Sequence, residues 1–203
     1  MRIKYPARSD NQTTAQLVGC HPSKVCLLVR AGLLEYLNGD LPGAVKYCAT
    51  IDVLERTSEP KWQITATKVL AGIDLDPAEL RALARKPRPR GLQVPTDAPA
   101  DQSLTRELVR TKFLNALTTT PDGSPVSALL GDGEVARILG FRLHDLPPLR
   151  RLGILRADNQ GLRSAKKLHS REYVLGLALD IAWLGTATRA INTYWSDKNA
   201  RKA

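Results

Sequence analysis

The sequence predicts a mostly helical protein with small β elements, built as two copies of one unit joined by a helical, proline-rich linker. Residues 15–67 and 136–188 align without a gap at an offset of 121, and 16 of the 53 aligned positions are identical. Ordinary composition would give about 3 or 4 identities by chance. Short apolar patterns of helical period alternate with Gly- and Pro-containing turns in both copies. We expect the copies at 10–74 and 128–200, with the linker at 75–127.

The first half of each copy is predicted to be a pair of short helices. In the first copy, one helix covers 14–18 and is capped by Thr13 or Thr14. A second covers 22–31, where apolar residues recur on one face. Gly32 ends this helix because glycine enters the left-handed region without strain.

The second half of the copy is predicted to be a hairpin followed by helices. The turn residues of 38–43 indicate a hairpin within 36–47. Helical patterns follow at 51–56 and 60–70. The order is therefore helix, turn, helix, hairpin, helix.

The linker has its own local signals. Residues 76–79 (Asp-Pro-Ala-Glu) predict a helix start, and that helix ends before the Pro-rich stretch 86–91. Residues 92–100 are predicted to be extended and 102–118 to be a second helix. A turn cluster at 120–125 precedes the second copy, in which two prolines delay the second helix until about Asp145.

Charge favours a polyanionic partner. The 203 residues include 30 Lys and Arg and 20 Asp and Glu, so the net charge is +10. Nucleic acid is the first candidate and an anionic membrane the second. Residues 126–203 alone carry a net charge of +6. No basic amphipathic helix suited to a membrane surface is evident.

The expected compartment is the cytoplasm. The N-terminal residues contain no apolar segment typical of a secretory signal. The most apolar stretch, 174–185, is too short to span a bilayer. Three cysteines, an odd number, are typical of free thiols in a reducing compartment.

A spaced glycine pattern carries a family resemblance. Leu17-Val18-Gly19 precedes Gly32-Leu33-Leu34, and Ile138-Leu139-Gly140 precedes Gly153-Ile154-Leu155, so the two glycines are 13 residues apart in each copy. In both copies a basic strand end then leads into an acidic helix start, at 46–54 and 167–175. This pattern resembles the winged helix-turn-helix of the MerR and excisionase families. The resemblance implies two tandem winged helix-turn-helix domains, with the second helix of each in the major groove and the wing on the DNA backbone.

The resemblance also implies a set of DNA-binding residues. The second helices would present His21, Ser23, Lys24, Leu27, Arg30, Arg142, His144, Asp145, Pro148, Arg150 and Arg151. The wings would place Lys46, Arg156, Arg163, Lys166, Lys167 and Arg171 against phosphates. Lys86, Arg88 and Arg90 loosely resemble an AT-hook, although a plain cationic linker is the favoured interpretation. Leaving aside Arg30, Arg150 and Arg151, eight of these residues occupy the base-reading positions, and of the eight only Lys24 and Arg142 are the Arg, Lys, Asn or Gln side chains that favour base edges, so the set does not favour base-specific reading.

Other chemistry is not favoured. The spacing of Cys20, His21, Cys26 and Cys48 fits no usual zinc site, and no metal or cofactor is expected. Trp62 and Trp183 are interpreted as core anchors rather than base-stacking platforms. No catalytic motif is evident, so an enzyme is not expected.

The sequence therefore predicts non-enzymatic binding of double-stranded DNA, as a transcription regulator, recombination accessory or architectural factor. The linker would set the effective concentration of one domain near the other. The alternative is a protein-interaction or assembly adaptor of the phage-packaging type. Exposed apolar residues on the second helices, Leu27 and Pro148, would favour that protein partner.

Overall fold

The structure is a computed structural model that describes residues 5–39, 44–73, 100–119, 126–158 and 166–201. Within these ranges the protein is mostly helical and contains two small antiparallel sheets of two strands each. The helix start predicted at 76–79 and the turn cluster at 120–125 lie outside the described residues.

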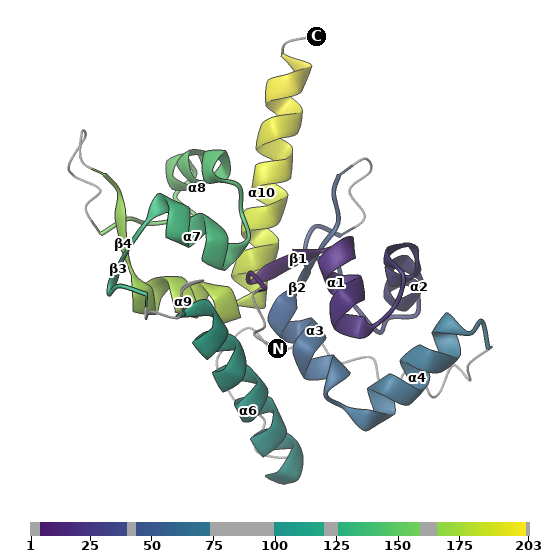
Figure 1. The fold of residues 1–203 in the computed structure, drawn as a ribbon. Helices are drawn as coiled ribbons and strands as arrows, with labels where there is room; N and C mark the ends of the chain where they lie inside the picture. The colour runs from purple at the N-terminus through teal and green to yellow at the C-terminus, as the bar shows by residue number, and fades with distance from the viewer. Residues whose placement is uncertain (1–4, 40–43, 74–99, 120–125, 159–165, 202–203) are drawn as a thin grey trace.

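Two units with the same order of elements make up most of the fold (Figure 1). The first unit contains β1 (Arg8–Asp10), α1 (Asn11–Val18), the 3₁₀ helix η1 (Pro22–Lys24), α2 (Val25–Arg30), β2 (Tyr47–Ala49), α3 (Thr50–Thr57) and α4 (Pro60–Leu70). The second contains β3 (Leu129–Gly131), α7 (Asp132–Leu139), the 3₁₀ helix η2 (Leu143–Asp145), α8 (Leu146–Arg151), β4 (Leu168–Ser170), α9 (Arg171–Leu179) and α10 (Ile181–Ala200). Every element of the second unit begins 121 residues after its counterpart, which is the offset that aligns the two sequences.

The first helix begins earlier than its predicted cap. Asp10 caps α1, and its Oδ1 accepts a hydrogen bond from the backbone N of Thr13 at 2.8 Å. The expected caps were therefore wrong: Thr13 lies inside the helix, and Thr14 is buried with its hydroxyl 3.0 Å from that of Ser9. Gly19 ends the helix in the left-handed conformation with φ +78°.

The predicted hairpin is replaced by a different strand pairing. β2 pairs antiparallel with β1, which precedes α1, and β4 pairs in the same register with β3. A strand before the first helix was not expected from the sequence. The base of the loop between α2 and β2 is closed by Asn38, whose Nδ2 donates to the carbonyl of Val45 at 2.8 Å, and by a backbone bond from Leu37 to Tyr47. Residues 40–43 at its centre are outside the described ranges.

The other helices of the first unit lie where the sequence predicted them. The helix predicted over 22–31 is present, with η1 as its first turn and α2 as the remainder. Gly32 follows with φ +71°, as expected of a residue that ends a helix. The helices predicted at 51–56 and 60–70 are α3 and α4.

In the second unit α8 begins at Leu146, next to the predicted start at Asp145, but the start is not delayed, because α2 begins at the equivalent position, Val25. The two prolines are not the cause of the 3₁₀ turn before α8. The first unit has the same 3₁₀ turn without prolines at the positions equivalent to Pro147 and Pro148.

Each unit contains a tryptophan with the same contact. Trp62 Nε1 donates to the carbonyl of Leu33 at 3.0 Å, and Trp183 Nε1 donates to the carbonyl of Ile154 at 3.0 Å. Trp62 is buried, and Trp183 packs half-buried against the core of the second unit. The interpretation of both as core anchors is confirmed.

The units are packed against each other, not only tethered. Ala7, Leu37, Ala49 and Ile51 of the first unit belong to the apolar core of the second. The backbone N of Ala7 also donates to the carbonyl of Ile138 at the end of α7, at 2.7 Å. The expectation that linker length sets the proximity of the units is therefore wrong, because direct packing fixes their separation.

Arg8 is a buried charged residue that also crosses this interface. Its guanidinium lies between the rings of Tyr47, 4.0 Å away, and Phe141, 3.8 Å away. Its Nε donates to the carbonyl of Gly140 at 2.8 Å, and its Nη1 donates to Thr188 Oγ1 at 3.4 Å. Burial lowers the pKa of Arg8 to about 10, so the side chain is still protonated at neutral pH.

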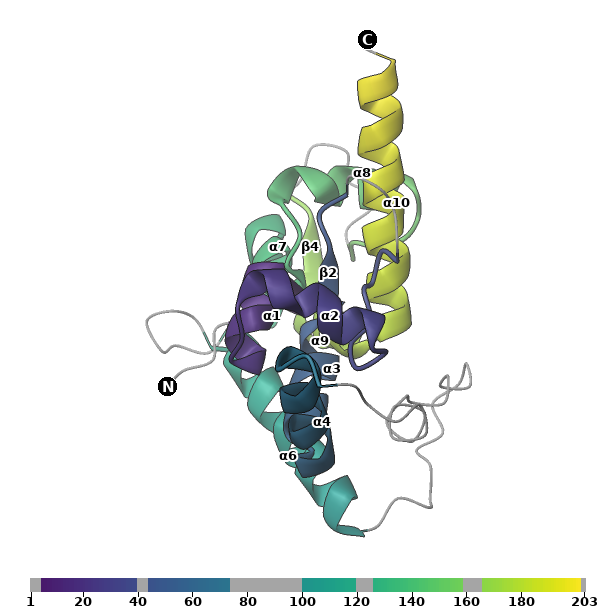
Figure 2. The same cartoon turned by 90° about the vertical axis from the view of Figure 1, so that its right-hand side faces the viewer.

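The helix predicted over 102–118 is α6 (Ala100–Leu117), which runs beside α3 (Figure 2). Arg106 pairs with Glu59 at 2.7 Å, and Arg110 pairs with the buried Glu55 at 2.6 Å. Phe113 is fully enclosed in the shared core. This part of the linker is therefore an integral layer of the fold.

Among the helices in the described ranges, none is by itself long and apolar enough to cross a membrane. The bent pair of α9 and α10, which meet at 90°, passes by length and composition only when the two are taken together.

Candidate nucleic-acid interface

Among the residues that the structure describes, the second unit has the largest excess of exposed positive charge. Among the described residues of 137–170, five basic side chains are exposed and one acidic side chain is exposed. The basic side chains are Arg137, Arg142, Arg151, Arg156 and Lys166, and the acidic one is Asp158. The equivalent stretch of the first unit exposes Lys24, Arg30 and Glu35. Of the described residues in these two stretches, those of the second unit therefore present more positive charge to a polyanion.

A partly buried polar cluster holds the backbone near several of these basic side chains. Both carboxylate oxygens of Asp132 accept bonds from Arg150, at 2.7 and 3.0 Å. His169, which is fully buried, has Nε2 at 3.3 Å from Asp132 Oδ1 and Nδ1 at 2.7 Å from the carbonyl of Arg156. Because a carbonyl oxygen only accepts, Nδ1 carries a hydrogen. The cluster ties α7, α8 and β4 to the start of the loop at Arg156.

The backbone of Arg156 is held from both sides. Its carbonyl accepts from His169, and its backbone N donates to the hydroxyl of Tyr173 in α9 at 3.2 Å. Its side chain is exposed. A charged side chain on a fixed backbone loses less entropy on binding than one on a loose loop.

Three of the residues expected on the outer face of the second helix do not lie there. Asp145 and Pro148 are buried, and Arg150 is half-buried in its pair with Asp132. The expectation that Pro148 is exposed for a protein partner was wrong. Arg142, His144 and Arg151 are exposed, as their assignment to a binding surface requires.

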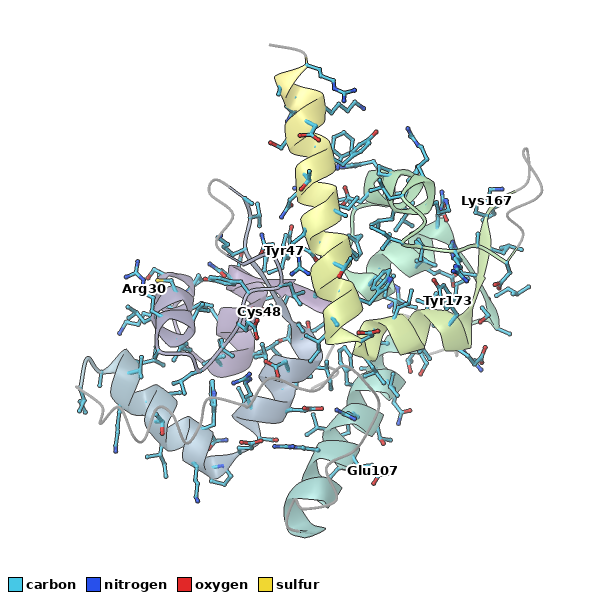
Figure 3. All side chains as sticks on the ribbon, turned by 180° about the vertical axis from the view of Figure 1, so that it is seen from behind. Arg30, Tyr47, Cys48, Glu107, Lys167 and Tyr173 are labelled. Atoms are coloured by element: carbon cyan, nitrogen blue, oxygen red, sulfur yellow. The ribbon has the colours of Figure 1, made fainter. Side chains whose placement is uncertain are left out.

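The helix of the first unit presents a smaller polar surface. His21 and Ser23 are exposed, but the His21 ring accepts from the backbone N of Ser23 at 3.3 Å and so caps η1. Lys24 Nζ donates to the carbonyl of Leu70 at the end of α4, at 3.0 Å. Leu27 is 37% exposed, and Arg30 points outward at the end of α2 (Figure 3).

The residues assigned to the wings are spread over different environments. Lys46 Nζ donates to the carbonyl of Gly39 at 2.9 Å. Arg171 is half-buried, with bonds to the carbonyl of Val126 and to Glu172. Lys166 is exposed and Lys167 half-buried just before β4, where Figure 3 labels Lys167. Arg163 and the linker residues Lys86, Arg88 and Arg90 lie outside the described residues.

The cysteines are free and differ in access. Cys48 in β2 is 1% exposed, and burial raises its pKa to about 12. Cys20 and Cys26 are half-buried, and burial also raises the pKa of Cys20. Within the described ranges, no three His, Cys, Asp or Glu side chains are grouped so that they could hold a metal ion.

We expect Cys48 to be inert toward thiol reagents in the native protein at about pH 8, because only the thiolate attacks. A C20S/C26S variant should therefore react only after guanidinium chloride is added, which absorbance of the released reporter thiol measures. Since the pKa of Cys48 in the fold lies above the unfolded value of about 8.5, stability should fall as the pH rises from about 8.5 toward 12. Rapid labelling of the native variant would contradict this.

Comparison with known proteins gives no relative from which a role could be transferred: no family model, curated protein or solved structure matches the chain.

Proposed function

We propose that this protein binds double-stranded DNA without enzymatic activity, through two tandem winged helix-turn-helix units. The observation that carries the proposal is the set of exposed basic side chains between the N-cap of η2 and the start of β4, where Asp158 is the exposed acidic group among the described residues. These side chains are Arg142, Arg151, Arg156 and Lys166. Such a surface matches the phosphate backbone, which dominates affinity for DNA.

The order of elements supports this assignment. Each unit has two helices separated by a turn with a left-handed glycine, Gly19 or Gly140, and then a loop that returns to a strand beside the first helix. The MerR and excisionase families, which the sequence resembles, have this kind of unit. In that arrangement the second helix approaches the major groove and the loop approaches the backbone.

The second unit is proposed to supply phosphate contacts rather than base reading. Pro147 and Pro148 leave the first turn of α8 without two backbone donors. Arg150 is committed to Asp132, so it cannot present its donors to a base edge. The first unit, with fewer exposed charges, would adjust the binding site or contact a partner.

A salt titration tests the proposal. Anisotropy of a fluorescent random-sequence duplex should give a slope of log K against log[salt] of about −4 or steeper, since each phosphate contact contributes roughly −0.9. In an R151A/R156A variant the slope should become shallower by about 2. A K61A/K112A variant removes two exposed charges on α4 and α6 and should keep the wild-type slope.

The alternative of a protein-interaction adaptor is favoured by one observation. Leu143 and Leu152, at the two ends of the η2–α8 segment, are 57% and 52% exposed. Apolar side chains with arginines beside them are typical of the core of a protein–protein interface, whereas a leucine side chain makes no contact with a phosphate charge. If the wild-type protein does not bind the duplex at roughly 50 mM salt, where basic DNA-binding proteins are strong, the adaptor function replaces the proposal.

A further inference from the structure

The last helix of the second unit is longer than its counterpart. α10 has 20 residues, whereas α4 has 11, and the two begin at equivalent positions. Figure 1 shows the end of α10 projecting past α8. The additional residues, 192–200, have no helical equivalent among the described residues of the first unit, where α4 ends at Leu70.

The additional turns of α10 hold the start of η2. Trp195 Nε1 donates to Oδ1 of Asp145 at 2.9 Å, and Asp145 Oδ2 accepts from the backbone N of Arg142 at 3.0 Å. The ring of His144 meets the indole edge-on, with centroids 5.3 Å apart and planes at 84°. The indole of Trp195 therefore packs directly against His144 and, through the Asp145 carboxylate, holds the backbone of Arg142. The buried Asp145 carboxylate gains the donors that its burial requires.

A cation of α10 also lies against the Trp195 indole, close to the start of η2. Lys198 Nζ lies 4.8 Å from the centroid of the Trp195 ring. His144 and Lys198 therefore flank one side chain although they are 54 residues apart in the sequence. Arg201 follows one turn after Lys198 and is exposed, while Asp197 is the exposed acidic residue of these turns.

We propose that the last turns of α10 form a second phosphate-contacting segment of the second unit, beside η2. Lys198 and Arg201 contact the DNA backbone next to the phosphates that Arg142 meets. Trp195 is a positioning residue, because it orients Arg142 and His144 and does not itself touch the DNA. This inference rests on the proposed DNA binding and adds to it the residues that extend the contact.

The first unit provides the internal comparison. The residue equivalent to Asp145 is Lys24, and its Nζ donates to the carbonyl of Leu70, the last residue of α4. In each unit, therefore, a side-chain hydrogen bond joins the residue before the second helix, Lys24 or Asp145, to the last helix of that unit. Only the second unit continues that helix and adds charge to it, so the extended contact should be confined to this unit.

Charge reversal on α10 tests the inference in the full-length protein. In the duplex titration, a K198E/R201E variant should show a slope that is shallower by about 2 than that of the wild type. The control K61E/K112E makes the same change in net charge at exposed positions of α4 and α6. Circular dichroism should be unchanged in both variants, since all four side chains are exposed. The urea midpoint of K198E/R201E should fall only slightly, because the variant loses the Lys198 contact with Trp195 and two cations at a helix C-terminus.

The outcomes separate this inference from the proposed function. If the wild type does not bind the duplex, the proposed function fails. If the wild type binds with a steep slope and the two charge-reversal variants behave alike, the proposed function stands and the α10 segment is overturned. A difference between the two variants supports the segment.

The role of Trp195 is measured with a W195F variant. Phenylalanine keeps an aromatic ring but lacks the N–H that reaches Asp145. We expect affinity to fall by about tenfold at fixed salt, because Arg142 and His144 would then have to be ordered on binding. The salt slope should stay at the wild-type value because no phosphate contact is removed. Unchanged affinity would overturn the positioning role.

Discussion

Replacing Gly140 with alanine is expected to reduce the free energy of unfolding by about 3 kcal/mol, whereas the same replacement at Gly19 should cost about 1 kcal/mol. The two glycines occupy the same position in the two units, directly after the first helix. Their backbones agree, with φ +78° at Gly19 and +76° at Gly140. The cost of placing a side chain in the left-handed region is therefore the same at both.

The difference comes from the interface between the units. A Cβ at Gly19 would have no heavy atom within 4 Å. A Cβ at Gly140 would lie 2.7 Å from the carbonyl oxygen of Arg8 and 3.0 Å from Cβ of Pro6. The strand cannot move away cheaply, because Ala7 donates to Ile138 and the Arg8 side chain is enclosed. The collision is with backbone, so it must separate the units or distort α7.

Urea unfolding followed by tryptophan fluorescence measures both variants. The wild-type m-value should be retained by G19A, so that its midpoint alone reports the change. If G140A and G19A are destabilised equally, the units do not pack as the Arg8 contacts require. A G19A variant that is much less stable than expected would instead point to a contact on the first unit.

The repeat and most helices could be predicted because their signals are local. A helix of this kind ends at a glycine that must take positive φ, and Gly19, Gly32, Gly140 and Gly153 all do so. Identical residues occur at an offset of 121 where the backbones of the two units have the same requirement, such as a glycine with positive φ. Tryptophan recurs at 62 and 183 because each indole N–H donates a hydrogen bond to the equivalent backbone carbonyl of its own unit, that of Leu33 or of Ile154.

The strands and the interface could not be predicted in the same way. β1 and β3 are only three residues long, too short to show the alternation that identifies a strand. Arg8 has no sequence signal for burial, since arginine is rarely enclosed. Its place depends on Tyr47 and Phe141, which are far from it along the chain.

The candidate site shows the same limit. Arg142, His144 and Arg151 were expected to be exposed from their position in the unit, and they are. Asp145 was expected beside them, but Trp195, which is 50 residues later, supplies the donor that makes its burial possible. Nothing in the repeat indicates that contact, because the residue that aligns with Trp195 at the offset of 121 is Asp74, which is not a tryptophan.

Replacing Arg8 with alanine is expected to reduce the free energy of unfolding by about 3 kcal/mol. The change removes a desolvated cation from between two rings, worth about 2 kcal/mol, and leaves the Gly140 carbonyl without its donor. It also relieves the cost of holding a charge in an enclosed place, which offsets part of the loss. The vacated space between Tyr47 and Phe141 adds a cavity cost, so the balance is clearly destabilising.

Two further variants separate position from chemistry. Leu129 occupies the equivalent place in β3 and is 51% exposed, so L129A should change stability by less than about 0.5 kcal/mol. R8K keeps the charge but loses the planar group that stacks on both rings, and it should cost about 2 kcal/mol. If R8K were as stable as the wild type, charge alone would account for the contribution of Arg8 to stability. If L129A were as destabilising as R8A, the position in the strand rather than the contact between the units would account for the effect. We expect the loss of stability to increase in the order L129A, R8K, R8A. This order requires that Arg8 stabilises the protein through its place between the two units.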